Sequence, residues 1–189
     1  STNQGSTVKP FPVNQLPDVS NKLEGDESEY PFVLHPYLTL TFLDGRGANL
    51  PWQQELPDPL TSVVYNSWVE LNPSTAVELD VREGDVLEVT SPSGTIRAPA
   101  FIYEAIRPDV VAMPIGQGHE QYGRYAEQRG VNPIDLVVPN FDQRSGALAW
   151  AGTRVKILKT GERVLLIKTD GVTRTLGRQI LGPPEAEHG

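Results

Sequence analysis

Short runs of apolar and β-branched residues, bounded by turn residues, recur along most of this chain. Five such runs are found at residues 37–43, 86–91, 95–103, 110–114 and 154–158. Runs of this length and composition predict β-strands rather than helices. The turn residues between the strands also predict hairpins. Pro92-Ser93-Gly94 joins the second run to the third, and Asp170-Gly171 separates residues 164–167 from a short strand that begins at Val172.

Helix signals are fewer and shorter. Asn72 can accept an otherwise unpaired N–H at a helix start, with Pro73 in the first turn, so residues 74–79 are predicted to be helical and Asp80 to turn left-handed. Asn132-Pro133 repeats this start for a shorter helix that runs through Leu136. A third helix is predicted over residues 120–128, ended by Gly130.

Many short strands with a few short helices indicate a mainly β (α+β) domain closed into a barrel of about six strands. The predicted core positions are Leu87, Val89, Ile96, Val110 and Val155. Residues 1–30 are polar and without period, which predicts an extended or mobile arm. The barrel is expected over residues 31–160, with a proline-rich irregular loop near residues 49–59, and a hairpin and tail over residues 161–189.

Composition removes several classes of function. A net charge of −8 opposes nucleic-acid binding, which depends on neutralising phosphates. The absence of cysteine excludes disulfides, thiol nucleophiles and iron–sulfur ligation by this chain, and three histidines do not favour a self-contained zinc site. No apolar run is long enough to span a bilayer. With no initiator Met and no signal peptide at Ser1, we expect a processed product or a piece of a longer protein.

One loop carries candidate chemistry. Its residues Gly116 to His119 permit close backbone approach and expose N–H groups before the helix predicted at residues 120–128. Tyr122, Arg124 and Tyr125 follow, and an arginine beside aromatic rings can contact phosphate or stack on a flat heterocycle. A plain turn with tyrosines that pack on the barrel explains the same residues. Both interpretations stay open at this point.

The stretch at residues 68–96 reads WVELNPSTAVELDVREGDVLEVTSPSGTI, and it resembles the C-terminal molybdopterin-dinucleotide-binding domain of the dimethyl-sulfoxide-reductase family. The family often has glycine where this chain has Asp80, a residue that tolerates the left-handed turn. The matching residues are Asn72, Pro73, Ala76, Leu79, Gly84, Asp85, Val86, Val89 and Gly94.

A further stretch, VAMPIGQGH (111–119), resembles the strand and Gly–His loop of the family. Other stretches resemble one branch of that family, which includes the large subunit of alternative complex III and related sulfur-compound reductases. They are DGRGANLPW (44–52), ELPDP (55–59), YGRYA (122–126), GVNP (130–133), SGALAW (145–150) and the tail hairpin at Asp170-Gly171 with Gly177-Arg178. The resemblance covers roughly residues 31–181.

The resemblance implies a double-psi β-barrel that closes over a molybdopterin guanine dinucleotide cofactor. It implies that metal ligands and iron–sulfur clusters belong to upstream domains or partner subunits of a respiratory oxidoreductase, periplasmic or membrane-associated. In the alternative-complex-III branch it implies that the fold is kept while the molybdenum cofactor is absent. A structural assembly domain and a stand-alone molybdopterin-binding module are therefore alternative functions. The cofactor-binding positions that the resemblance implies are Asp44, Arg46, Gly116, Gly118, His119, Tyr122, Asn132 and Asp142.

Overall fold

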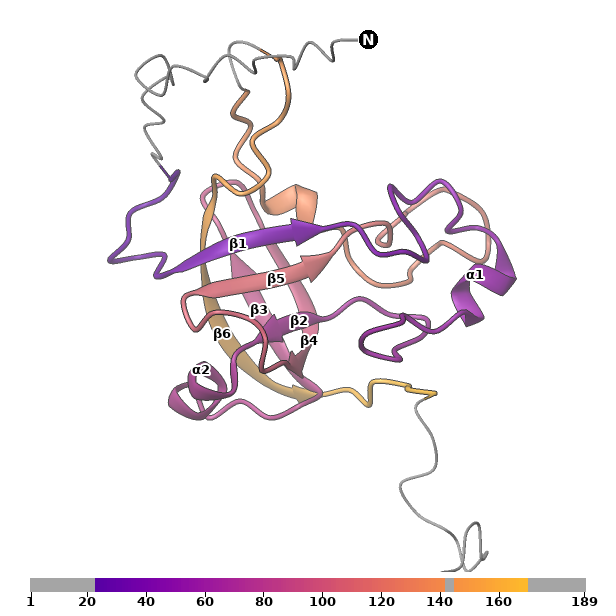
Figure 1. Ribbon diagram of the computed structural model, residues 1–189, viewed down its shortest axis with the longest axis horizontal. Helices are drawn as coiled ribbons and strands as arrows, with labels where there is room; N and C mark the ends of the chain where they lie inside the picture. The colour runs from indigo at the N-terminus through magenta and orange to yellow at the C-terminus, as the bar shows by residue number, and fades with distance from the viewer. Residues whose placement is uncertain (1–22, 142–144, 170–189) are drawn as a thin grey trace, which may run out of the picture.

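The computed structural model describes residues 23–141 and 145–169, and these form a closed six-stranded barrel in the order β1-β5-β2-β4-β3-β6 (Figure 1). Closure leaves no free sheet edge, which suits a domain of short strands. The predicted mainly β barrel is confirmed. The strands are β1 (Phe32–Tyr37), β2 (Val69–Leu71), β3 (Asp85–Thr90), β4 (Thr95–Ile102), β5 (Val110–Pro114) and β6 (Arg154–Arg163).

Strand direction decides which loops meet. β1 pairs with β5 in parallel, from Val33 opposite Val110 to Tyr37 opposite Pro114, and β2 pairs with β4 in parallel. The other neighbours are antiparallel. Because parallel strands end at the same edge, the loops that follow β1 and β5 start side by side (Figure 1).

The barrel interior is filled by residues that alternate along the strands. On β3, Leu87 and Val89 are fully buried while Glu88 points outward and pairs with Arg97 on β4. Val155 is fully buried as predicted, whereas Ile96 and Val110 are only partly buried. Val110 is the first residue of β5 and Ile96 the second of β4, so both lie at strand ends.

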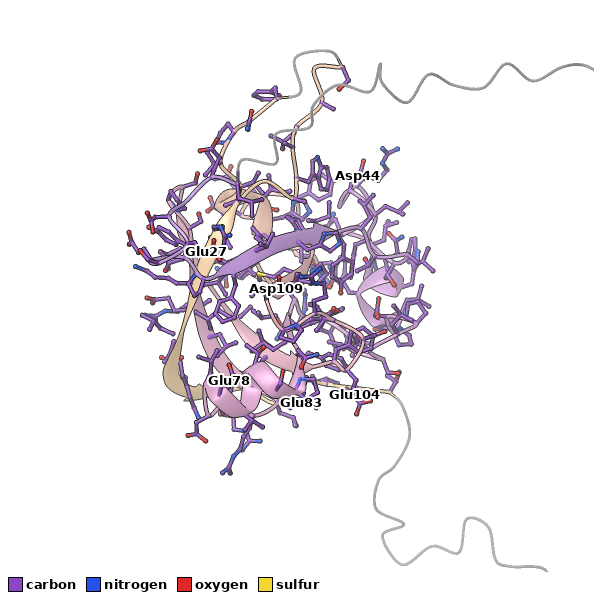
Figure 2. The ribbon with its side chains drawn as sticks, turned by 60° about the vertical axis from the view of Figure 1, so that its left-hand side comes forward. Glu27, Asp44, Glu78, Glu83, Glu104 and Asp109 are labelled. Carbon is purple, nitrogen blue, oxygen red and sulfur yellow. The ribbon has the colours of Figure 1, made fainter. Side chains whose placement is uncertain are left out.

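Both predicted asparagine caps are present. Asn72 Oδ1 accepts from Ser74 N at the start of α2 (Pro73–Glu78), and Asn132 Oδ1 accepts from Ile134 N before the 3₁₀ helix η2 (Pro133–Leu136). Asp80 has the predicted left-handed backbone, with φ of 51°. Figure 2 shows Glu78 on α2, whereas Asp44 lies at the other end of the molecule.

One helix was not predicted. α1 (Pro51–Glu55) forms inside the proline-rich loop, with Pro51 in its first turn. A contact with the preceding loop stabilises α1, because Gln54 is buried and its side-chain Nε2 donates to Ala48 O.

The strand predicted at residues 37–43 is wrong beyond Tyr37. Its pairing partner β5 ends at Pro114, so the chain has no neighbour to continue the ladder. The backbone turns instead: Leu43 N donates to Thr39 O, and Phe42 N donates to Thr39 Oγ1. Leu43 then takes a left-handed backbone, with φ of 49°.

The helix predicted at residues 120–128 does not form either. Gly123 has φ of +91°, and the side chain of Asn49 lies so close to it that a Cβ there would be 2.4 Å from Asn49 Nδ2. Asn49 Oδ1 also accepts from Tyr125 N. A tertiary contact therefore takes a backbone donor that the helix would have used.

The C-terminal segment also differs from its predicted strand. Residues 164–167 form no strand; Val164 N donates to Gly84 O, and Val64 N donates to Ile167 O. The Asp170-Gly171 turn lies outside the described residues, as do residues 1–22. The domain boundaries at residues 30 and 160 stay predictions.

Candidate functional site

The loops that follow β1 and β5 are in direct contact with each other. A Cβ on Gly116 would lie 2.6 Å from Phe42 Cβ, and Gly116 has φ of +102°. The same loop touches the segment before η2, since a Cβ on Gly118 would lie 2.4 Å from Asn132 N. Gly116 and Gly118 therefore allow protein segments to approach one another.

Asp44 and Arg46 form a two-pronged ion pair at the outer rim of these loops. Arg46 Nε lies 2.9 Å from Asp44 Oδ1, and Arg46 Nη2 lies 2.6 Å from Asp44 Oδ2. Hydrogen bonds from Arg46 lower the pKa of Asp44 to about 2. The Arg46 side chain is 80% exposed. Exposed pairs of this kind are weak, so the guanidinium can exchange its partner at small cost.

Tyr122 ties the two loops together. Its hydroxyl donates to Arg46 O at 2.8 Å, and its ring lies 4.8 Å from the His119 ring, tilted by 34°. His119 Nε2 is buried and has no hydrogen-bond partner within the described residues. It faces Gly45, where a Cβ would lie 2.9 Å away. A buried imidazole nitrogen without a partner is unusual, and it marks a place where a ligand or water can donate or accept.

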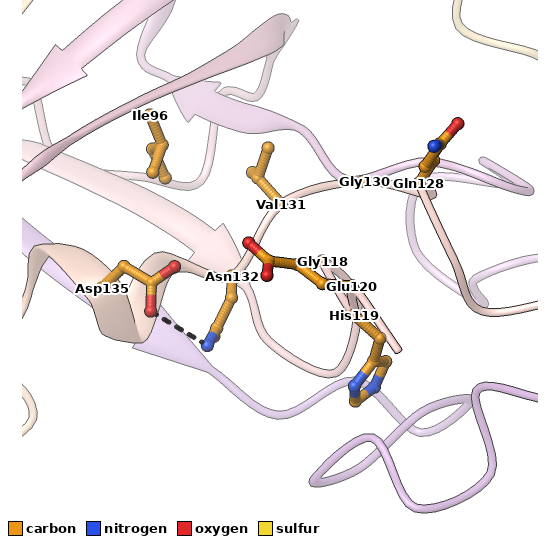
Figure 3. A pocket seen from close by; sticks show the side chains of 9 residues that line it. All are labelled: Ile96, Gly118, His119, Glu120, Gln128, Gly130, Val131, Asn132 and Asp135. Atoms are coloured by element: carbon orange, nitrogen blue, oxygen red, sulfur yellow. Dashed lines mark hydrogen bonds between the residues drawn. The ribbon is translucent and has the colours of Figure 1, made fainter. Parts of the chain in front are cut away.

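A cavity of about 350 Å³ opens beside this loop. Figure 3 shows that Glu120 and Asp135 bring two carboxylates to it, and its lining contains no lysine or arginine. The lining residues are Ile96, Gly118, His119, Glu120, Gln128, Gly130, Val131, Asn132 and Asp135. A cavity with carboxylates and no cation suits groups that donate N–H bonds better than it suits a phosphate.

Asn132 is already engaged in this arrangement. Its Oδ1 caps η2, and its Nδ2 lies 3.4 Å from Asp135 Oδ1, as the dashed line in Figure 3 shows. The second N–H of the Asn132 amide and the second oxygen of Asp135 are available to a ligand.

The structure thus gathers seven of the eight predicted site residues at one end of the barrel. Asp44, Arg46, Gly116 and Tyr122 form the rim, Gly118 and Asn132 form the cavity wall, and His119 belongs to both. Asp142 lies outside the described residues. The prediction missed Glu120 and Asp135, although the position of Asp135 three residues after the Asn132 cap was a usable signal.

Neither a metal-binding cluster nor a membrane-spanning helix is found among the described residues. Among residues 23–141 and 145–169, no group of three or more His, Asp or Glu side chains could hold a metal ion. The same residues include no helix with the length and apolar character to cross a bilayer.

The fold and the site define a β-barrel domain with a carboxylate-lined cavity and an aromatic–histidine rim. Residues 52–153, a little over half of the chain, match the family described as the molybdopterin dinucleotide binding domain. The chain belongs to this family, as the resemblance at residues 68–96 predicted.

Similar curated proteins agree with this assignment. The molybdopterin-containing subunit ArrA of the arsenate respiratory reductase of a Shewanella species is 38% identical over 143 residues, which cover 71% of this chain and 17% of that protein. The molybdopterin-binding-like subunit of the menaquinone reductase of Nitratidesulfovibrio vulgaris is 28% identical over 144 residues, covering 76% of this chain and 21% of that protein. This chain therefore spans about a fifth of the length of such relatives.

The acetylene hydratase from Pelobacter acetylenicus shares the fold, with a TM-score of 0.54 and 17% identity over 70% of this chain and 19% of that one. The fold is a double-psi β-barrel, as predicted.

Proposed function

We propose that this chain is the cofactor-binding barrel of a respiratory oxidoreductase and that the cavity of Figure 3 binds a ring end of molybdopterin guanine dinucleotide. One observation carries the proposal: the carboxylates of Asp135 and Glu120 line a cavity beside the unpartnered His119 Nε2. Guanine and pterin rings both present an edge of N–H and amino donors, which a carboxylate accepts in pairs. The volume of about 350 Å³ lies within the range of small-molecule sites.

The phosphates of the dinucleotide would contact the rim instead. Arg46 is exposed there, and the hydrogen bond from Tyr122 to Arg46 O fixes its backbone beside His119. A planar guanidinium binds a phosphate through two parallel hydrogen bonds. Arg46 must first break its ion pair with Asp44, which is weak because it is exposed.

The molybdenum carried by the cofactor supplies the redox chemistry when it is bound. The residues described here bind and orient the organic part of the cofactor: Asp135 and Glu120 accept its N–H groups, His119 and Tyr122 close one side, and Arg46 neutralises charge. Their role is binding, and no step of the reaction falls to them.

The proposal is tested with guanosine, which carries the donor edge without a phosphate. We expect guanosine to shift the amide NMR signals of residues 118–135, and Asp135→Asn to weaken binding by about 1–3 kcal/mol because it removes a charged acceptor. Asp109→Asn is the matched control, since Asp109 is paired with Arg107 beside the start of β5. Guanosine binding that is equal in both variants contradicts the proposal.

A second candidate is a structural barrel that has lost its cofactor. It is favoured by the use of Gly118 and Asn132 in contacts within the protein and by the ion pair that occupies Arg46. His119→Ala separates the two functions. If the cavity binds the cofactor, His119→Ala weakens guanosine binding. If the barrel is only structural, His119→Ala lowers the melting temperature and the parent chain does not bind guanosine.

We further propose that the remainder of such an oxidoreductase, with iron–sulfur clusters, covers the loop end of this barrel, in the periplasm or at a membrane. The support is an unusually apolar surface that follows β1. Residues 38–54 contain one acidic and one basic side chain, Asp44 and Arg46, which pair with each other. The exposed large apolar residues of this segment and its continuation, here called the apolar face, are Leu38, Leu40, Leu43, Leu50, Trp52, Leu56 and Leu60. Surfaces of this kind mark protein contacts.

A further inference from the structure

A second cavity, of about 360 Å³, shares no residue with the candidate cofactor cavity. It lies between α1, the segment before β2, the loop after β5 and the C-terminal segment. Its lining residues are Pro51, Gln54, Glu55, Tyr65, Tyr125, Arg129 and Ile167. Nothing in the proposed cofactor site uses it.

Arg129 is the unusual member of this set. Its guanidinium lies 5.4 Å from the centroid of the Tyr65 ring, and its Nε is buried with no hydrogen-bond partner. Within the described residues no carboxylate comes within ion-pair distance of Arg129, although Glu55 lines the same cavity. A half-buried guanidinium with unused donors is costly unless something accepts from it.

The backbone is strained on both sides of this cavity. Tyr65 has φ of 63°, a left-handed conformation that costs free energy for an aromatic residue. Its N–H donates to Gln54 O at 3.3 Å, which holds it in place. Gln128, directly before Arg129, also has a left-handed backbone, with φ of 58°. Strain at two segments that hold one ring and one cation against each other is typical of a binding site.

The polar side chains of two other parts of the cavity already have hydrogen-bond partners. The side chains of Gln54 and Gln117 exchange two hydrogen bonds, of 2.9 and 3.1 Å, and both residues are buried. At the far wall, Arg124 donates to the Tyr125 hydroxyl and lies 4.6 Å from the centroid of the same ring. Arg129 Nε is therefore the buried donor of this cavity that has no hydrogen-bond partner within the described residues.

We propose that Arg129 binds an oxyanion in this cavity, a phosphate or carboxylate group, with the rings of Tyr65 and Tyr125 at its sides. The guanidinium fork matches the oxygens of either group, and charge-assisted hydrogen bonds of this kind are the strong ones. Glu55 repels the same ligand, so it limits affinity and favours an anion of higher charge. This site is separate from the cofactor cavity and goes beyond the proposed function.

The test is a calorimetric and NMR titration of the chain with sodium pyrophosphate, and in parallel with sodium acetate, at constant ionic strength. Pyrophosphate binding identifies a phosphate site, and acetate binding of equal or greater strength identifies a carboxylate site. Either ligand is expected to shift the signals of Tyr65 and Tyr125. Arg129→Gln is expected to lower affinity by about 10-fold or more, as for the loss of a charged hydrogen bond.

Two variants provide the controls. Arg107→Gln makes the same charge change at a site beside the start of β5, and we expect it to leave the affinity unchanged. Glu55→Gln removes the opposing carboxylate and is expected to raise the affinity about 2- to 5-fold, which loss of folding cannot imitate. No shift at either tyrosine with both ligands, or equal affinity in Arg129→Gln and Arg107→Gln, overturns the proposal. Guanosine binding is unaffected by this outcome, so the cofactor site is judged separately.

Discussion

At the scale of single residues, the least expected group is a carboxyl on the outer face of β2. Glu70 is buried between Val69 and Leu71, which face the core. The Tyr37 hydroxyl donates to Glu70 Oε1 at 2.5 Å, and Trp68 Nε1 donates to the same oxygen at 3.0 Å. Burial raises the pKa of Glu70 above its ordinary 4.5 in spite of the two donors, which lower it.

This raised pKa predicts a pH dependence of stability. Between pH 4.5 and the higher folded pKa, the folded chain holds a proton that the unfolded chain has lost, so ionisation of Glu70 favours unfolding. The free energy of unfolding contributed by Glu70 is therefore complete below pH 4.5 and falls as the pH rises through the folded pKa. In Glu70→Gln this fall is expected to be absent. Urea midpoints of both proteins across this range measure it, and a constant difference between them contradicts the assignment.

A second prediction concerns the close approach at Gly118. Gly118→Ala is expected to destabilise the chain by about 1–3 kcal/mol, since the new Cβ meets Asn132 N at 2.4 Å in a left-handed backbone. Gly161→Ala is the matched control, because Gly161 has nearly the same φ, +86° against +87°, with nothing within 4 Å of its Cβ position. Chemical denaturation of both variants separates the contact from the backbone strain. Equal losses mean that the contact with Asn132 is unimportant.

At the scale of elements, the sequence predicted a helix correctly where a side chain caps the N–H groups of its own segment. Asn72 accepts from Ser74 N and Asn132 from Ile134 N, and both helices begin where the sequence predicts. Local signals failed where a distant segment competes. The helix at 120–128 is interrupted by Asn49, and the strand after Tyr37 ends because β5 ends.

Asn72, the N-cap residue of α2, makes a second hydrogen bond whose contribution to stability can be separated from that of the cap. Asn72 Nδ2 donates to Ile106 O at 2.6 Å, which links α2 to the segment before β5. Asn72→Ala is expected to cost about 1–2 kcal/mol of unfolding free energy because both bonds are lost. Asn72→Asp keeps the cap and loses the link, so an intermediate value is expected. Urea unfolding measures both, and an Asp variant as unstable as the Ala variant shows that the cap contributes little.

At the scale of the whole molecule, the candidate cofactor cavity and the apolar face share the loop end of the barrel, whereas Glu78 and Glu83 lie at the end near α2 (Figure 2). That end also exposes an apolar side chain, Val77. The apolar face is a candidate contact surface, because exposed apolar patches of this kind mark sites of protein interaction.

The apolar face predicts that the isolated chain associates with itself. Replacing Leu40 and Trp52, which are 79% and 64% exposed, by Asn and Gln is expected to lower the sedimentation-derived mass toward that of a monomer. The unfolding free energy should change by less than about 1 kcal/mol because neither side chain is buried. Val77→Asn, at a residue that is 81% exposed on α2, should leave association unchanged. Equal effects of both changes would falsify the role of this face.

The sequence by itself determined the strands from residue 86 to residue 114, the strand at residues 154–158, both asparagine caps, the left-handed Asp80 and the family. Each of these depends on short-range periodicity, capping or turn chemistry, which neighbouring residues carry. It also named the loops of the site, because the resemblance followed their order along the chain. The tertiary structure alone decided the rest. The parallel pairing of β1 with β5 brings residues 44–46 beside residues 116–122, and the turn into η2 brings Asp135 to the cavity. Contacts between residues far apart in the chain leave no local pattern, so Glu120, Asp135 and Arg129 gain their significance only from the folded chain.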